Sequence, residues 1–147
     1  MIAVRATLPA PPAAVFDVLA DGWSYAGWVV GATHVRDVDA GWPAVGTRIH
    51  HCFGTWPFEV HDVTEVTAVD PPRLLELDAR LSPFGTARVR FELTGVRTTT
   101  ACMSEVVVGG AARLLPRAAQ ALLLVPRNRE TLVRLGTLAA GRYRSYR

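Results

Sequence analysis

The sequence contains no lysine, only two cysteines and no apolar run long enough to cross a membrane. Its 16 Lys/Arg positions are all arginine, and they are spread along the chain rather than gathered on one predicted face. Nucleic-acid binding, which needs such clustering, is therefore not expected. The densest basic stretch, residues 142–147, is interpreted as a frayed, solvated tail.

Cys52 and Cys102 have neither CxxC nor CxxH spacing, which favours buried reduced thiols over a disulfide or a structural zinc site. The N-terminus has no basic region followed by an apolar block and a cleavage site, so a cytoplasmic protein is expected. GxSxG, P-loop, GxGxxG and HExxH motifs are absent. A metal held by His50 and His61 would need a third ligand that no spacing indicates, so neither a metal nor a cofactor is predicted.

With 147 residues, half of them hydrophobic, the chain predicts one globular domain over 1–147 with a sizeable core. Its most regular stretch is 112–140, where apolar residues recur every three or four positions, as on one face of a helix. These residues are Leu115, Ala118, Ala119, Leu122, Val125, Leu132, Leu135 and Ala139. The arginines of this stretch, Arg127 among them, fall mostly elsewhere. Pro126 and, less strongly, Pro116 predict a kink or a restart, because proline lacks the amide donor and clashes with the preceding turn.

Before this helix the pattern is almost entirely that of strands. Residues 2–8 predict a first strand, a proline-initiated helix follows to about Ala20, and a second helical or turn segment covers residues 23–30. Turn residues separate six further predicted strands, at residues 33–38, 46–53, 56–69, 73–80, 84–94 and 98–108. Consecutive strands with short turns predict an antiparallel meander, whose apolar face the C-terminal helix must cover.

This succession carries a resemblance to a known superfamily through five segments. They are Pro11-Pro12-Ala13-Ala14-Val15-Phe16-Asp17-Val18-Leu19-Ala20-Asp21, Trp28, Gly46-Thr47-Arg48, Val69-Asp70-Pro71-Pro72-Arg73-Leu74 and Phe91-Glu92-Leu93. The chain resembles the START-related polyketide cyclase/dehydrase and lipid transport superfamily (SRPBCC), which has the helix-grip fold of the birch-pollen allergen. The resemblance implies an α+β fold in which a curved antiparallel seven-stranded sheet wraps around a long C-terminal helix, with two short helices between strands 1 and 2. It also implies a cavity for hydrophobic molecules between sheet and helix, and aromatase/cyclase activity in a minority of members.

Strand alternation predicts which side chains face that cavity. Residues 86–93 place Val89 and Phe91 inward. A two-residue hairpin turn at Gly54-Thr55 predicts that His51 faces inward, as either a hydrogen-bonded core residue or a functional group. The same turn sets four pairs opposite each other: His51 and Phe58, Ile49 and Val60, exposed His50 and Glu59, and exposed Arg48 and His61.

The last strand has two possible registers. If three residues connect it to the preceding strand, Ala101, Met103 and Glu105 face inward, and Phe91 lies opposite Ala101. If the turn has two residues, a more polar set of side chains faces inward. Hydrophobicity favours the first register, which buries the Glu105 carboxylate. Such a carboxylate needs a partner, so Glu105 is interpreted either as a cavity acid that binds a ligand or a water, or as a residue exposed or paired with an arginine. The face of Asp62 is left open, because its neighbours indicate a bulge.

The preferred hypothesis is a binding protein for a hydrophobic small molecule such as a lipid, a polyketide or an aromatic metabolite. The predicted cavity walls are Trp28, His51, Phe53, Phe58, Val60, Val89, Phe91, Met103 and Glu105 from the first part of the chain, and Leu115, Ala119 and Leu122 from the helix. The alternative is a cyclase or dehydratase that uses His51 and Glu105 as acid and base. The arginine-rich outer face of the helix leaves a homodimer open.

Overall fold

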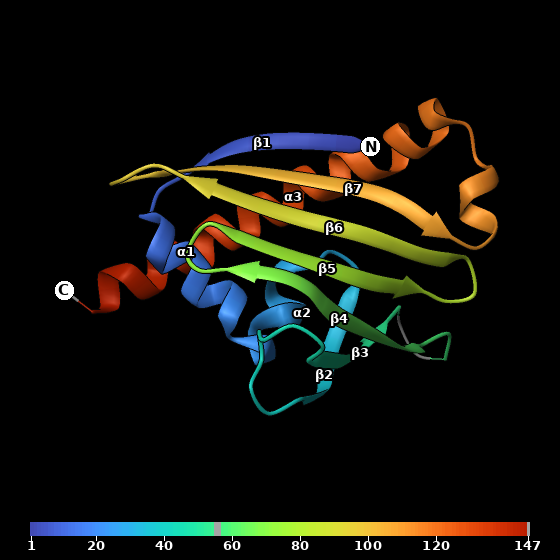
Figure 1. Cartoon of the computed structure of the whole chain (residues 1–147), viewed down its shortest axis with the longest axis horizontal. Coiled ribbons are helices and arrows are strands. Elements are labelled where there is room, and N and C mark those ends of the chain that lie inside the picture. Colours follow the sequence, from blue (N-terminus) through green and yellow to red (C-terminus); the bar gives the residue numbers. More distant parts are fainter. Residues whose placement is uncertain (55–56, 147) are drawn as a thin grey trace.

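The computed structural model describes residues 1–54 and 57–146, and it consists of a seven-stranded antiparallel sheet crossed on one face by a long C-terminal helix (Figure 1). The strands are β1 (Ile2–Leu8), β2 (Ala32–Val38), β3 (Arg48–Phe53), β4 (Val60–Asp70), β5 (Leu74–Leu81), β6 (Gly85–Thr94) and β7 (Thr99–Gly109). Their order is β1-β7-β6-β5-β4-β3-β2, so β2 to β7 form a meander and β1 completes the edge beside β7. The predicted helix-grip arrangement is confirmed.

Two short helical segments lie between β1 and β2, as predicted. The first is α1 (Pro12–Ala20), which begins directly after Pro11, and the second consists of a 3₁₀ turn, η1 (Gly22–Ser24), followed by α2 (Tyr25–Trp28). A proline at the first helical position does not remove a helical hydrogen bond, because the amides of the first turn have no partner within the helix. Both segments bury aromatic or aliphatic side chains, including Phe16 and Trp28.

After β7 the chain forms a short 3₁₀ helix, η2 (Ala111–Leu114), and then α3 (Arg117–Ser145). Pro116 stands at the start of α3, whereas Pro126 lies inside it. The predicted restart at Pro126 is wrong, because its turn is exposed and water can hydrogen-bond the carbonyl that a proline leaves without a donor. The predicted frayed tail is also wrong for residues 142–145, which form the last turn of α3, while Arg147 lies outside the described residues.

The part of α3 that packs against the rest of the fold begins near Val125, which is partly buried against the core. Its buried residues are Asn128, Thr131, Leu132, Leu135, Gly136, Ala139 and Ala140. The predicted apolar stripe is therefore right over its second half and wrong over its first, where Leu122 is 79 % exposed. The helix packs mainly against β1, α1 and α2, and its first turns lie beyond the β1 edge of the sheet (Figure 1, orange).

The strand registers differ from the predicted ones by even numbers of residues. Phe91 pairs with Met103 rather than with Ala101, and His51 pairs with Asp62 rather than with Phe58. The predicted turn residue Thr55 lies outside the described residues, but Phe53 pairs with Val60, so the connection between β3 and β4 is longer than two residues. Because the side-chain period of a strand is two, these shifts leave every side chain on its predicted face.

The hairpin shift changes the surface ion pairs of β3. The predicted pair of His50 with Glu59 is wrong, since His50 Nε2 lies 3.2 Å from a carboxylate oxygen of Asp39. The predicted pair of Arg48 with His61 is also wrong, because Arg48 lies opposite Glu65 and contacts it at 3.5 Å.

Among the described helices, none has both the length and the apolar character needed to cross a bilayer.

Candidate ligand-binding site

The concave face of the sheet and α3 enclose a cavity of about 30 Å³. Its walls are Tyr25, Trp28, Val29, Phe53, Leu77, Ala79, Val89, Phe91, Met103, Glu105, Arg127 and Thr131. This volume holds only one or two water molecules, so the expectation of a spacious interior is wrong. Aromatic rings from α2 and the sheet line the remaining space.

A larger hollow of about 360 Å³ opens to solvent beside this cavity. It is lined by Val30, Gly31, Phe53, Gly54, Phe58, Val60, Asp62, Ser82, Phe84 and Arg127. Phe53 and Arg127 line both spaces, so these two side chains stand between the hollow and the interior. A molecule in the hollow would contact them before it reached the buried cavity.

The structure brings most of the predicted wall residues together. The buried cavity is lined by Trp28, Phe53, Val89, Phe91, Met103 and Glu105, and the hollow by Phe53, Phe58 and Val60. Their role in ligand binding stays a prediction. The residues Leu115, Ala119 and Leu122 line neither space, because they belong to the part of the chain that projects beyond the sheet, and Thr131 and Arg127 of α3 take their place.

Glu105 is buried and bound by two side chains of α3. Its carboxylate is 1 % exposed and accepts hydrogen bonds from Arg127 Nη2, at 3.0 Å to each oxygen, and from Asn128 Nδ2 at 2.7 Å. The predicted inward position of Glu105 is confirmed, and its partner is an arginine. Sequence reasoning missed Arg127 and Asn128, because it assigned Arg127 to the outer face of the helix. The requirement that a buried carboxylate find a cation was the signal that could have identified it.

His51 lies one layer behind the cavity wall, in a hydrogen-bonded chain with Tyr25 and Thr64. The Thr64 hydroxyl lies 2.9 Å from both the Tyr25 hydroxyl and His51 Nε2. The imidazole is stacked on Tyr25 and meets the edge of Phe53, with ring centroids 4.9 Å apart in each case. Both aromatic neighbours line the cavity, so His51 is separated from it by a single ring.

Burial changes the ionisation of this chain. It raises the pKa of Tyr25 to about 12 and lowers the pKa of His51 to about 4. His51 is therefore neutral at pH 7. Its Nδ1 is the one buried side-chain nitrogen or oxygen in the described part of the chain without a hydrogen-bond partner.

Asp62, whose face the sequence left open, points inward and closes the side of the hollow. It is 4 % exposed and accepts hydrogen bonds from the backbone amide of Ser82 at 3.1 Å and from its hydroxyl at 2.9 Å. The carboxylate thus fixes the end of β5 against β4. Among the described residues, the side chains that could hold a metal ion are His34, Cys52 and Glu59, and they line neither the cavity nor the hollow.

The chemistry of the site is that of an apolar surface with few polar groups. Exposed aromatic rings form the hollow, a guanidinium stands at its inner end, and a neutral imidazole lies behind the wall. This arrangement can hold an apolar molecule and orient one polar group of it.

Comparisons with known proteins agree with the fold. A family model described as polyketide cyclase / dehydrase and lipid transport matches residues 1–140. The structure of the Zhui aromatase/cyclase from Streptomyces sp. R1128 has a TM-score of 0.68 at 18 % identity and covers 99 % of this chain and 94 % of that chain. A protein from Arthrobacter aurescens has a TM-score of 0.73 at 12 % identity, over 95 % of this chain and 85 % of that one.

A third similar structure is the di-domain ARO/CYC StfQ from the steffimycin biosynthetic pathway. Its TM-score is 0.71 at 13 % identity, and the match covers 98 % of this chain and 46 % of that chain. At such identities these structures show a common fold and no more. No curated protein matches the sequence.

Proposed function

Because the chain belongs to the polyketide cyclase / dehydrase and lipid transport family, we propose that it binds a hydrophobic small molecule with one polar end. The site is the hollow beside α3, and the ligand class is a polyketide, an aromatic metabolite or a lipid. The hollow's volume of about 360 Å³ falls within the range of small-molecule sites, about 300 to 1,000 Å³. The observation that carries the proposal is that two exposed phenylalanine rings and the Arg127 guanidinium line this one concave surface. The buried cavity of about 30 Å³ is too small to serve alone.

The apolar part of the ligand is assigned to the aromatic rim of the hollow. Phe58 is 83 % exposed and Phe84 is 63 % exposed, although both are large apolar side chains. Two such rings around one concave surface are typical of a place that an apolar partner covers. Val60 and Phe53 continue the apolar wall inward from these rings.

The polar end is assigned to Arg127. Its Nη2 is held by Glu105 and its Nε donates to Asn128 Oδ1 at 3.3 Å, which fixes the guanidinium at the inner end of the hollow. Its Nη1 has no hydrogen-bond partner among the described residues and can donate to a carbonyl or carboxylate oxygen. Glu105 uses both oxygens to hold Arg127 in this position, so its role is to position the arginine.

The test is a fluorescence titration with 8-anilinonaphthalene-1-sulfonate, a bicyclic aromatic anion that combines the two features assigned to the ligand. The double variant Phe58→Ser/Phe84→Ser should bind this probe about tenfold more weakly, because two aromatic contacts are lost. The matched control is Leu114→Ser/Leu122→Ser, which removes two side chains that are 86 % and 79 % exposed and lie outside the hollow. Its affinity should stay within about twofold of the native value. Equal losses in the two variants, or no binding by the native protein, would contradict the proposal.

A second candidate function is acid–base catalysis on a poly-β-keto substrate, and one observation favours it. His51 is neutral, and its buried Nδ1 lacks a partner, so a ligand that displaced Phe53 could use it as a proton acceptor. Glu105 fits the partner role less well, because donors occupy both of its oxygens. If the protein turns over a poly-β-keto thioester, His51→Gln should lower kcat at least tenfold and leave binding of the fluorescent probe unchanged. Turnover by this variant at the native rate would exclude His51 as the base.

A further inference from the structure

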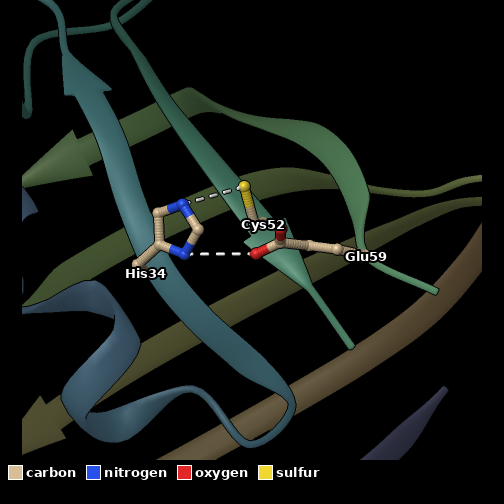
Figure 2. A group of neighbouring side chains, drawn as sticks. All are labelled: His34, Cys52 and Glu59. Atoms are coloured by element: carbon tan, nitrogen blue, oxygen red, sulfur yellow. Dashed lines mark hydrogen bonds and ion pairs between the residues drawn. The ribbon is translucent and has the colours of Figure 1, made fainter. Parts of the chain in front are cut away.

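Three side chains with metal-binding atoms, His34, Cys52 and Glu59, lie close together in the region of β2 and β3 (Figure 2). His51 of β3 points into the interior, so its neighbour Cys52 points to the opposite face. There His34 Nε2 lies 3.3 Å from Cys52 Sγ, and His34 Nδ1 lies 3.2 Å from a carboxylate oxygen of Glu59. The imidazole thus stands between a thiol and a carboxylate.

The fold assembles this group from three separate segments. His34 of β2 and Cys52 of β3 are partners in the antiparallel ladder, next to a bulge that follows Ala32. Glu59 immediately precedes β4, and the Thr33 hydroxyl lies 3.3 Å from both its carboxylate and the Cys52 carbonyl. No local spacing in the sequence links the three residues, which is why the sequence predicted no metal site.

The separation of His34 from Cys52 matches that of two ligands on one tetrahedral metal ion. Zinc binds imidazole nitrogen, thiolate and carboxylate with bonds of about 2.0 to 2.3 Å, so two ligands of one ion lie about 3.5 Å apart. The distance of 3.3 Å between His34 Nε2 and Cys52 Sγ matches this separation. The ligand atoms of all three residues lie within 4.8 Å of one another. Glu59 contacts the other ring nitrogen, Nδ1, so its carboxylate has to turn toward Nε2 to bind the same ion as Cys52.

The same three residues also have the order of a nucleophile, a base and an orienting acid, but their exposure speaks against that role. Cys52 is 0 % exposed, so a substrate cannot reach its sulfur. Reactive cysteines are accessible thiolates. His34, by contrast, is 55 % exposed, which leaves one side of the group open for an ion to enter and for a water ligand to complete its coordination.

We propose that His34, Cys52 and Glu59 bind a divalent transition-metal ion of the zinc class on the outer face of β2 and β3. The site is distinct from the hollow beside α3, since none of its three ligands lines that hollow. Its thiolate and imidazole favour zinc or cobalt over magnesium or calcium, which prefer ligand sets made of oxygen atoms.

The test is titration of the reduced, chelator-treated protein with Co²⁺, monitored by absorption. The native protein should give the near-ultraviolet charge-transfer band of a cobalt–thiolate bond and the visible bands of a four-coordinate ion, and one equivalent of Zn²⁺ should remove both. Cys52→Ser should abolish the charge-transfer band. The matched control Cys102→Ser, which removes the other free cysteine, should retain it.

Two variants of exposed or half-exposed residues keep the test valid if Cys52→Ser does not fold. His34→Ala and Glu59→Gln should each weaken Co²⁺ binding at least tenfold, whereas His50→Ala, which removes a histidine of the same face, should not. The proposal is overturned if the native protein gives no charge-transfer band, if that band survives in Cys52→Ser, or if His50→Ala loses binding as His34→Ala does.

Discussion

At the scale of single residues, the ion pair of Glu105 with Arg127 joins the interior of the sheet to α3. Glu105 is almost fully buried, and Arg127 supplies its charge partner from α3 while remaining 27 % exposed at the hollow. Removing the arginine leaves a buried carboxylate with Asn128 alone, and an uncompensated buried charge is strongly destabilising. The pair therefore connects the stability of the fold to the inner end of the proposed ligand site.

Arg127→Met should lower the free energy of unfolding by about 3 kcal/mol, the loss expected when one partner of a buried ion pair is removed. The double variant Arg127→Met/Glu105→Gln should lose less than the single variant, because it removes the uncompensated charge as well. Arg134→Met provides the control, since its ion pair with Glu130 on the same helix is exposed and should contribute at most about 0.5 kcal/mol. Denaturant unfolding of the four proteins measures these differences, and a double variant less stable than the single one would contradict the account.

His51 makes stability depend on pH in a defined direction. Burial lowers its pKa from 6.5 to about 4, so between these values the unfolded chain binds more protons than the folded protein. The contribution of His51 to the free energy of unfolding is therefore complete above pH 6.5 and decreases as the pH falls towards 4, by about 3 kcal/mol in total. Unfolding curves of native protein and His51→Gln across this range should converge as the pH falls. His61→Gln, which changes an exposed histidine, should keep the native slope, and parallel curves for native protein and His51→Gln would refute the argument.

At the scale of elements, α3 has a buried half and an exposed half. Gly136 lies where β1 passes closest, since a Cβ on it would stand 3.0 Å from Leu8 Cδ2. The small residue thus permits a close approach of helix and strand, and the buried residues of α3 centre on this contact. The turns before Pro126 make no comparable contact with the sheet.

A pair of leucine variants tests this division of α3. Leu132→Ala should lower the free energy of unfolding by about 3 kcal/mol, because Leu132 is completely buried and its loss leaves a cavity. Leu122→Ala should change it by less than about 0.5 kcal/mol, since that side chain is 79 % exposed. The two substitutions have the same chemistry in the same helix, so equal losses in denaturant unfolding would show that the N-terminal half of α3 is also packed.

The elements also show what periodicity can and cannot predict. Alternation assigned the faces of β3, β6 and β7 correctly, including the inward positions of His51 and Glu105, because the face of a side chain depends only on parity. The predicted register of β6 with β7 was wrong by two residues, and that of β3 with β4 was wrong by four. Register depends on loop length, and the sequence does not specify how many residues a loop uses. The predicted apolar stripe of the helix was wrong before Val125, because amphipathicity indicates an apolar face without showing whether a partner covers it.

At the scale of the whole molecule, the order of elements and the sheet topology could be predicted from the sequence, and the shape of the site could not. Turn residues and strand patterns predicted the meander, and the apolar periodicity of residues 112–140 predicted the helix that covers it. The size of the buried cavity depends on how Tyr25, Trp28 and Phe91 pack against one another. Such packing between distant segments cannot be predicted from a pattern along the sequence. The polar partner of Glu105 and the group of His34, Cys52 and Glu59 likewise arise from contacts between distant segments.

We have proposed that the ligand binds in the hollow between the β3–β4 region and α3. A crystal structure of the protein grown with 8-anilinonaphthalene-1-sulfonate tests it most directly. We expect density for the naphthalene rings between Phe58 and Phe84, with the sulfonate directed at Arg127. Density in the groove between α1 and the last turns of α3, or along the exposed first turns of α3, with the hollow left empty, would contradict it.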